Sequence, residues 1–310
     1  MFEKLRGKVW IYLNTHTPKP IRDKVWDFLV DYYPRLLLDY IWKRDFGYTV
    51  DWKHPRDLNE KIEWMIVYSD TSLWSKLADK FQVRDFVTKK GYAHLLVPLL
   101  GVYNSPDELD YDKLPERFVL KCNHDANSTM IVDQTANPDF ALIASFYRER
   151  LAMKFGYCYC QPHYNKIQPR LLAETLLEDQ GNEISSSLID YKVWCFNGKP
   201  HVVFVAFNRT KSSLTSEIHA LDWTLLPDYR NEKSLYIDGR GKVPKPDCLD
   251  EMLKAASVLS EGFPQVRVDF FVANGKLYLS EMTFTSANGR MTSFSKKAQI
   301  KMGRLVDIGK

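Results

Sequence analysis

The sequence predicts an α+β protein in which helices come first and strands follow. Residues 1–92 carry apolar side chains at helical spacing, whereas from Leu95 onward the apolar runs become short and are bounded by glycine or proline. Two Asn-Gly dipeptides, at 197–198 and 274–275, lie between apolar runs and predict β-hairpins. With 310 residues, the chain has the length of about two domains.

The first 56 residues are predicted to form an N-terminal helical extension. Residues 1–45 mix basic and aromatic side chains, and one face of an amphipathic helix would consist of Ile21, Val25, Phe28, Leu29, Tyr32 and Leu36. Two interpretations are open. Either this face packs against the body of the protein, or residues 1–45 touch a membrane surface or a partner protein.

Residues 57–116 are predicted to form an N-terminal α/β region. The letters DLNE at 57–60 read as a capping box, in which Asp57 accepts from a free backbone N–H and Glu60 reaches back. A second helix is expected over residues 72–90, and Gly91 would end it. A strand is expected between Leu95 and Tyr103.

Two further units are predicted, at 117–175 and 176–310. In the first, the apolar patterns predict strands at 117–123, 129–133 and 169–174, with a helix from Pro138 to about Met153. In the second, they predict hairpins at 191–207 and 266–284 and a helix at 249–262.

Composition narrows the class of protein. The 43 basic residues against 39 acidic ones leave a net charge of +4, which is too mild for a dedicated nucleic-acid binder but suits a negatively charged ligand. The 14 glycines complete neither a P-loop nor a dinucleotide fingerprint, since both motifs need glycine at fixed spacing. Neither a membrane span nor a signal peptide is recognisable. The expected location is therefore the cytoplasm, at the inner face of the membrane if residues 1–45 touch lipid.

The last hairpin carries acidic side chains whose placement depends on strand register. Arg267 and Asp269 are two residues apart and share one face of a strand. A two-residue turn at the Asn-Gly dipeptide pairs positions that sum to 549 and sends Glu281 to the opposite face. A three-residue loop, or a bulge at the glycine, makes the sum even and can bring Glu281 beside Asp269. Two carboxylates and Thr283 would then suit Mg²⁺; otherwise the acids are exposed on an amphipathic hairpin.

Lysines form a second group of candidates. Lys121 ends a predicted strand and opens a loop of small polar residues, where the loop N–H groups and the Ser128 hydroxyl can hold phosphate oxygens. Lys80 and Lys192 are weaker candidates for the same role. The strand at 169–174 continues into an acidic segment, which can offer backbone groups to adenine and a carboxylate to ribose. Taken singly, each of these lysines also fits a solvated surface position.

The order of these motifs resembles the TupA-like ATP-grasp family of bacterial polysaccharide and teichuronopeptide biosynthesis. The resemblance runs from about Leu58 to Gly289 and rests on the segments LNEKIEWM, KLADKFQVRDFV, PLLGVY, LPERFVLKCNH, IQPRLLAE, DYKVWCFNGKP, LDWTLLP and GFPQVRVDFFVANGKLYLSEMTF. It implies an ATP-grasp fold, in which two α+β lobes clamp ATP. Residues 117–175 would form lobe 1, with the phosphate loop, and residues 176–310 lobe 2, with the Mg²⁺ and catalytic residues.

The resemblance also implies which residues form the site. The implied ATP contacts are Lys80, Lys121, Asn123, Ser128, Glu174, Thr175, Leu177, Glu178, Asp179 and Lys192. The three lysines would contact phosphates, residues 174–177 would hold adenine through backbone groups, and Glu178 or Asp179 would take the ribose. The implied Mg²⁺ ligands are Asp269, Glu281 and Thr283. The implied catalytic residues are Lys121 and Arg267, the latter steadying an acyl phosphate.

Two departures from the family pattern stand out. The family carries a glycine-containing loop after KCNH, whereas this chain has Asp125, Ala126, Asn127 and Ser128. Asp125 would bring a negative charge beside the expected phosphates. Either the loop turns outward, or Asp125 sits near the metal, or the grip on phosphate is weakened. The usual ExN ending is ExT here, with Thr283 in the place of asparagine.

The activity that the resemblance implies is an ADP-forming carboxylate–amine ligation through an acyl phosphate, with ATP and Mg²⁺ as cofactors. The implied substrates are a uronic-acid carboxylate of a capsular or cell-wall polysaccharide precursor and an amino acid or amine. The alternatives are a glycan phosphotransferase or glycosyltransferase of the same pathway, and a degenerate scaffold without turnover. The intact set of Arg267, Asp269 and Glu281 argues against degeneration.

Overall fold

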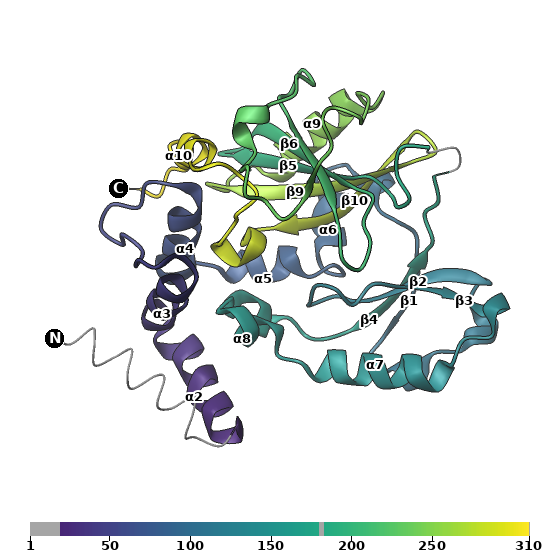
Figure 1. Ribbon diagram of the computed structural model, residues 1–310. Coiled ribbons are helices and arrows are strands. Elements are labelled where there is room, and N and C mark those ends of the chain that lie inside the picture. The colour runs from purple at the N-terminus through teal and green to yellow at the C-terminus, as the bar shows by residue number, and fades with distance from the viewer. Residues whose placement is uncertain (1–18, 180–182, 310) are drawn as a thin grey trace.

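The computed structural model describes residues 19–179 and 183–309, which form two β-sheets with helices packed against them. The smaller sheet has the order β1-β4-β2-β3 and consists of β1 (Leu99–Tyr103), β2 (Arg117–Cys122), β3 (Met130–Asp133) and β4 (Leu171–Thr175). The larger has the order β10-β9-β5-β6-β7-β8 and consists of β5 (Asp190–Phe196), β6 (Lys199–Phe207), β7 (Thr215–His219), β8 (Ile237–Asp238), β9 (Val266–Ala273) and β10 (Lys276–Thr283). Figure 1 shows the larger sheet above the smaller one. The predicted α+β class is confirmed.

The N-terminal part is helical, with α2 (Lys19–Tyr32), α3 (Pro34–Phe46) and α4 (Leu58–Tyr68). The predicted capping box at the start of α4 is confirmed. The Asp57 side chain accepts from the Glu60 N–H at 2.9 Å, and the Glu60 carboxylate accepts from the Asp57 N–H at 3.3 Å. Both early free N–H groups of the helix are therefore satisfied.

The predicted apolar face of α2 packs on the body only in part, because Leu29 packs against the core and Val25 is half-buried. Ile21 is 54% exposed, Phe28 51% and Tyr32 69%, because the helix packs through its other side, where the Trp26 indole N–H donates to the Tyr157 carbonyl. The interpretation of a buried face is wrong for these side chains. Contact with a membrane or a partner stays a prediction, and residues 1–18 of the predicted segment lie outside the described residues. No helix within the described ranges is long and apolar enough to cross a bilayer.

Glu63 on α4 is fully buried and leads to a test of pH dependence. Burial raises the pKa of this carboxyl from its ordinary value to about 8, although the Arg290 guanidinium opposes the shift. Between the ordinary pKa and about 8 the folded state therefore binds one more proton than the unfolded state, so stability falls as pH rises. Over this window the free energy of unfolding of the wild type should fall by a few kcal/mol, in order of magnitude. We expect Glu63→Gln to abolish this fall, because glutamine does not titrate. Urea unfolding of both proteins from about pH 5 to pH 8 checks this; parallel pH profiles would contradict it.

The single helix predicted over residues 72–90 is wrong. The chain forms α5 (Ser72–Ala78) and α6 (Val83–Lys89) instead. Between them the Asp79 carboxylate accepts from the N–H groups of Phe81 and Gln82 at 2.8 and 3.3 Å. Such a side chain-to-backbone turn competes with helical hydrogen bonding. Lys80 therefore lies in a turn between two helices.

The smaller sheet packs one face against α7 (Phe140–Ala152), and α8 (Phe155–Tyr159) follows α7 before the chain returns to the sheet as β4. Its core consists of Phe118, Leu120, Cys122, Val132, Ile143, Tyr147, Leu171 and Ala173. α7 begins at Phe140, two residues later than predicted, because the Asp139 side chain caps it by accepting from the Leu142 N–H. β1, predicted as part of the 57–116 region, pairs with β4 and so belongs to this sheet. The domain boundaries themselves stay predictions.

The larger sheet is covered on one face by α9 (Leu249–Leu259), while α10 (Lys296–Gly303) packs on α4 near the end of the chain. Both predicted hairpins, β5–β6 and β9–β10, are present. β7 escaped prediction because its sequence, TSEIH, is mostly polar although all five residues are buried. Glu217 and His219 there bond to each other at 2.9 Å, which satisfies them in the interior.

A β-bulge decides the register of the last hairpin. Next to the two-residue turn the pairs sum to 549, as in Leu279 with Phe270, but beyond the bulge Glu281 pairs with Asp269 and the sum is 550. Ser280 is the extra residue. The two-residue turn and the even sum, posed as alternatives by the sequence, therefore both occur. The bulge lies at Ser280 on an edge strand and not at the glycine of the turn.

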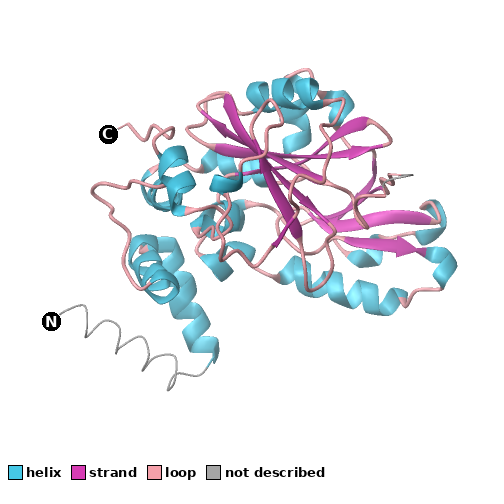
Figure 2. Ribbon diagram, turned by 45° about the horizontal axis from the view of Figure 1, so that its top comes forward, coloured by secondary structure: helices cyan, strands magenta, loops and turns pink. Residues whose placement is uncertain are grey.

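One face of each sheet is covered by its own helix, and the other faces lie toward the space between the sheets, where Figure 1 also shows α5 and α6. α7 lies under the smaller sheet and α9 over the larger one, as Figures 1 and 2 both show. On β2, Lys121 points away from the core residues Leu120 and Cys122; on β9, Asp269 points away from Phe270. The faces that carry Lys121 and Asp269 therefore turn toward each other.

Candidate active site

The face of the larger sheet opposite α9 carries six polar residues from three adjacent strands. We call this group the charged face: Asp190, Lys192, Arg267, Asp269, Glu281 and Thr283. The register explains the grouping. Lys192 pairs directly with Asp269 across β5 and β9, and Glu281 pairs with Asp269 across β9 and β10. Residues directly opposite each other on neighbouring strands share a face. The Ser280 bulge is therefore what brings Glu281 into the group.

Arg267 is the centre of the hydrogen bonds on the charged face. Its guanidinium binds both Asp269 carboxylate oxygens at 2.6 Å, in the forked geometry that suits this pair. The same group donates to Glu281 at 3.3 Å and to the Thr283 hydroxyl at 3.1 Å, and its other end donates to the Ser286 hydroxyl at 3.0 Å. Asp269 has no exposed surface.

Lys192 lies between two carboxylates on the same face. Its ammonium is 2.7 Å from Asp269 and 2.5 Å from Asp190. Burial acts to raise the pKa of Asp269, but Arg267 and Lys192 outweigh it and hold that pKa below its ordinary value. For Asp190 burial prevails over the Lys192 charge and raises the pKa. The other Asp190 oxygen, Oδ1, is buried without a hydrogen-bond partner in the described structure.

The donor set on this face fits a hard cation. Asp269, Glu281 and Thr283 offer two carboxylates and a hydroxyl, oxygen ligands of the kind that Mg²⁺ shares with phosphates and water. Within residues 19–179 and 183–309, no group of three or more His, Cys, Asp or Glu side chains suits a metal ion by itself. A cation here would therefore need further oxygens from a bound ligand.

The facing side of the smaller sheet presents the predicted phosphate contacts. Lys121 is 2.6 Å from the Glu174 carboxylate, and Arg84 from α6 is 3.7 Å from the same residue. Lys80 donates to the Asp125 carbonyl oxygen at 2.5 Å. The structure thus brings Lys80 to the loop that follows Lys121. The two are far apart in the sequence, so no local pattern predicts this contact.

Asp125 points into the protein, away from the positions where phosphates are expected. Its side chain is fully buried, lies 2.5 Å from the Arg150 guanidinium and accepts from the Ser128 hydroxyl at 2.5 Å. The sequence suggested an outward loop, a metal contact or a weakened grip on phosphate for this aspartate. A buried pair with Arg150 was not among these alternatives. Because Arg150 neutralises Asp125, the negative charge is not presented to a ligand.

The family model for TupA-like ATP-grasp proteins matches residues 60–307. The chain belongs to the TupA-like ATP-grasp family. No curated protein shows a significant match to the chain. The resemblance read from the motifs is therefore confirmed over most of the chain, including both sheets and the charged face.

Solved structures that resemble this TupA-like ATP-grasp chain include ligases. A D-alanine–D-alanine ligase from Bacillus anthracis complexed with ATP is 15% identical, with a TM-score of 0.42 over 74% of this chain and 65% of that one. The Helicobacter pylori enzyme of the same name is 14% identical, with a TM-score of 0.40 over 82% and 68%. The ATP-grasp ligase PsnB, complexed with minimal precursor, Mg and ADP, is 12% identical, with a TM-score of 0.39 over 89% and 67%. The chain thus spans less than two thirds of the first of these proteins, and likenesses at this level assign no activity.

Two predicted ATP contacts of this ATP-grasp protein have their side chains in the interior. Asn123 has no exposed surface; its amide donates to Asp79 and to the Gln168 carbonyl and accepts from the Arg170 N–H. Ser128 is 2% exposed and accepts from the Cys122 N–H at 2.9 Å. As placed here, both residues shape the loop after Lys121 and present no side-chain surface to a nucleotide.

The hinge segment after β4 is held from both lobes. Glu178 accepts from Arg117 of the smaller sheet at 2.5 Å, while Asp179 accepts from the Asn274 N–H of the β9–β10 turn at 2.9 Å. Thr175 donates its N–H to the Pro98 carbonyl, and the half-buried Leu177 follows. Both candidate ribose carboxylates therefore have protein partners in this structure, and the ribose contact stays a prediction.

Four residues at this ATP-grasp site were missed by the sequence analysis: Arg84, Tyr164, Asp190 and Arg209. Asp190 had a usable signal, because it lies two residues before Lys192 in a predicted strand and must share its face. Arg209 lies 3.7 Å from Asp190. Burial, and next the Glu281 charge, raise the pKa of Tyr164. Arg84, Tyr164 and Arg209 reach the site only through tertiary packing.

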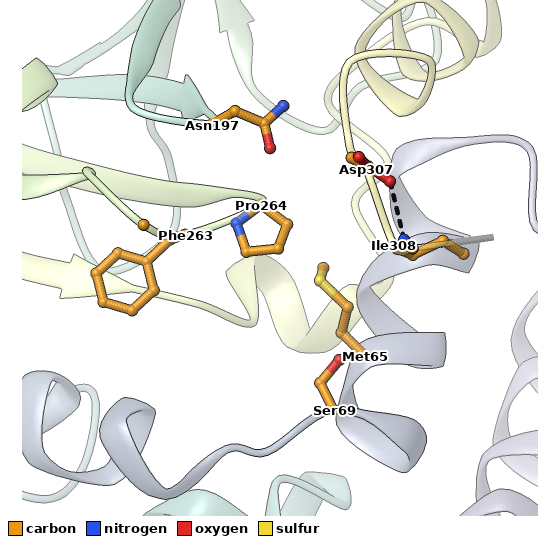
Figure 3. A pocket seen from close by; sticks show the side chains of 9 residues that line it. Met65, Ser69, Asn197, Phe263, Pro264, Asp307 and Ile308 are labelled. Atoms are coloured by element: carbon orange, nitrogen blue, oxygen red, sulfur yellow. Dashed lines mark hydrogen bonds between the residues drawn. The ribbon is translucent and has the colours of Figure 1, made fainter.

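A pocket of about 500 Å³ lies away from the family's site. Figure 3 shows it between the end of α4, the β5–β6 turn and the C-terminal residues. It is lined by Met65, Ser69, Asn197, Gly262, Phe263, Pro264, Asp307, Ile308 and Gly309. None of the predicted site residues borders it. The candidate site is therefore defined by the charged face and not by this hollow.

Proposed function

We propose that this chain is an ATP- and Mg²⁺-dependent carboxylate–amine ligase that forms ADP. The observation that carries the proposal is the convergence of Arg267, Asp269 and Glu281 on one face, opposite the Lys121 side of the smaller sheet. Membership of the ATP-grasp family supports the use of ATP.

The proposed reaction has two steps. A carboxylate oxygen of the acceptor attacks the γ-phosphorus of ATP, and the bond from that phosphorus to the ADP oxygen breaks, which yields an acyl phosphate and ADP. The amine nitrogen then attacks the acyl carbon, inorganic phosphate leaves, and the nitrogen loses a proton to complete the amide. Positioning and charge neutralisation account for most of the rate in phosphoryl transfer.

The chain's own residues divide that work. Lys80 and Lys121 would neutralise and orient the phosphates from the smaller sheet, with Lys192 facing them from the larger one. Mg²⁺ held by Asp269, Glu281 and Thr283 would supply further charge neutralisation to the phosphate oxygens. Arg267 would exchange part of its Asp269 contact for the acyl phosphate. Its planar fork suits phosphate as well as carboxylate.

We propose a uronic-acid carboxylate of a capsular or cell-wall polysaccharide precursor as the acceptor, and an amino acid or amine as the nucleophile. The support for this substrate class is the resemblance to the TupA-like family, since the described loops carry no recognisable sugar-binding motif. The positive side chains at the site, Lys121, Lys192 and Arg267, suit ATP and an acyl phosphate, which both carry negative charge. They are therefore compatible with a carboxylate acceptor.

An ADP-release screen of uronic-acid glycans crossed with amino acids tests the proposed function. We expect ADP only when both substrates are present, together with a product whose mass equals the two substrates less one water. Asp269→Asn is the blank, and Asp250→Asn, an exposed acid in the first turn of α9, is the matched control. ADP with glycan alone and a stable phosphorylated sugar would indicate a phosphotransferase. ATP binding by calorimetry without any turnover would indicate a scaffold.

A further inference from the structure

The segment that follows β10 is held in an unusual backbone conformation. Ala287, Asn288 and Gly289 are consecutive residues with φ of 46°, 57° and 71°. The left-handed region costs a residue with a side chain free energy, and alanine has no side-chain hydrogen bond to offset it. Such strain persists only where the surroundings over-determine it, and it clusters at functional sites.

One end of this segment is tied to the charged face. The Ser286 hydroxyl, which is buried, accepts from the Arg267 guanidinium at 3.0 Å. The Gln161 side chain bonds to the Thr285 hydroxyl and donates to the Asn288 side chain at 2.7 Å. The position of Ser286, and with it one end of Arg267, therefore depends on how the strained residues are held.

The other end is tied to the N-terminal helices through Arg290. This guanidinium is 9% exposed and lies 3.1 Å from Asp45, in the last turn of α3, and 3.3 Å from Glu63 on α4. Gly289 packs so closely on Glu63 that a Cβ atom there would come within 2.9 Å of its carboxylate. Asn59, also on α4, brackets the next residue by donating to the Met291 carbonyl and accepting from its N–H.

We propose that Arg290 is a positioning residue for Arg267, and that the helices α3 and α4 therefore support the active site. Asp45 and Glu63 hold Arg290, Arg290 holds the strained turn, and the turn places Ser286 against Arg267. The inference rests on the proposed function for the part that concerns turnover. It gives the N-terminal helices a role that no motif in them suggests.

The chain of contacts predicts a specific pattern of kinetic effects. The ion pairs of Arg290 are to Asp45 and Glu63, neither of which is a predicted ATP contact, so its loss should leave ATP affinity essentially unchanged. Arg267 keeps its fork on Asp269 but loses the fixed position of its other end. Small misplacements of catalytic groups cost up to about 100-fold in rate, so we expect kcat to fall by about 10- to 100-fold in Arg290→Gln.

The first arm of the test needs no turnover. Hydrogen exchange of the peptide spanning residues 285–291 should speed up in Arg290→Gln, and Arg290→Lys should restore part of the protection. Lys296→Ala is the matched control, because the Lys296–Asp57 pair also joins the C-terminal part to α4 but does not touch the strained turn. Unchanged exchange in Arg290→Gln would overturn the inference, whatever the activity of the protein.

The second arm measures coupling by combining Arg290→Gln with Ser286→Ala. If Arg290 acts through Ser286, the double variant should be no slower than Ser286→Ala alone, whereas independent structural damage would multiply the two losses. Multiplied losses, or a kcat equal to that of the wild type, overturn the inference. A wild-type protein without turnover in any substrate screen would instead overturn the proposed function, and the exchange data would still decide whether Arg290 holds the turn.

Discussion

Replacing Asp269 with asparagine is expected to lower the turnover of the proposed ligase reaction by at least about 100-fold. The carboxylate has no exposed surface, binds both ends of the Arg267 fork and meets Lys192 at 2.7 Å. Asparagine keeps the shape of the side chain but offers only one neutral oxygen. Arg267 and Lys192 therefore lose their shared negative partner, and the proposed Mg²⁺ loses a ligand. ADP release under saturating ATP, compared with wild type, measures the effect.

The same substitution should also destabilise the fold, because breaking a buried ion pair costs about 3–5 kcal/mol. Activity must therefore be compared below the unfolding transition of the variant. Asp250→Asn, in which an exposed acid makes the same chemical change, should retain wild-type turnover. If folded Asp269→Asn retained turnover similar to that of wild type, the charged face would not be the reaction site.

The second large effect is expected at Arg150 on α7. Arg150→Met should lower the free energy of unfolding by about 3–5 kcal/mol, since it strands the fully buried Asp125 carboxylate without its cation. It should also weaken ATP binding. Asp125, which lies in the loop that follows Lys121, would then turn out of the interior, and its carbonyl, which Lys80 contacts, would shift. Urea unfolding and calorimetric titration with ATP check the two parts.

Arg148→Met provides the control, because Arg148 lies on the same helix and its partner Asp107 is exposed. Surface pairs of this kind contribute little. The double variant Asp125→Asn, Arg150→Met should recover part of the lost stability, as the unpaired charge is gone. An Arg150→Met protein as stable as wild type would show that Asp125 finds water or another cation, contrary to the buried pair seen here.

Local features of this fold were readable because they depend on neighbouring residues. The Asp57 cap, the two Asn-Gly turns and the Gly91 stop each need only a few adjacent side chains. Even the Ser280 bulge left a trace. The buried residues of β10 follow a period of two through Leu277 and Leu279 and then slip to Met282. That slip is what an extra residue in a strand produces.

The site was only partly readable, because its charges are balanced across long distances in the sequence. From the sequence, the negative charge of Asp125 was expected to oppose phosphate binding. In the structure Arg150, on helix α7, neutralises this charge. Asn123 and Ser128 have polar side chains of the right type, yet the packing of the loop turns both inward. In the same way, α2 shows a helical apolar face whose side chains Ile21 and Phe28 are exposed.

The sequence by itself determined the order of helices and hairpins, the capping of α4 and the family, because these follow from local hydrogen bonding and motif order. Tertiary structure alone decided that Glu281 shares a face with Asp269, that Asp125 is paired, and that Arg290 links α3 and α4 to Arg267. For Asp125 and Arg290 the physical reason is that burying a charge is favourable only with a partner in place, and the partner comes from wherever the fold delivers it. For Glu281 the reason is the bulge at Ser280, which shifts the register of the hairpin.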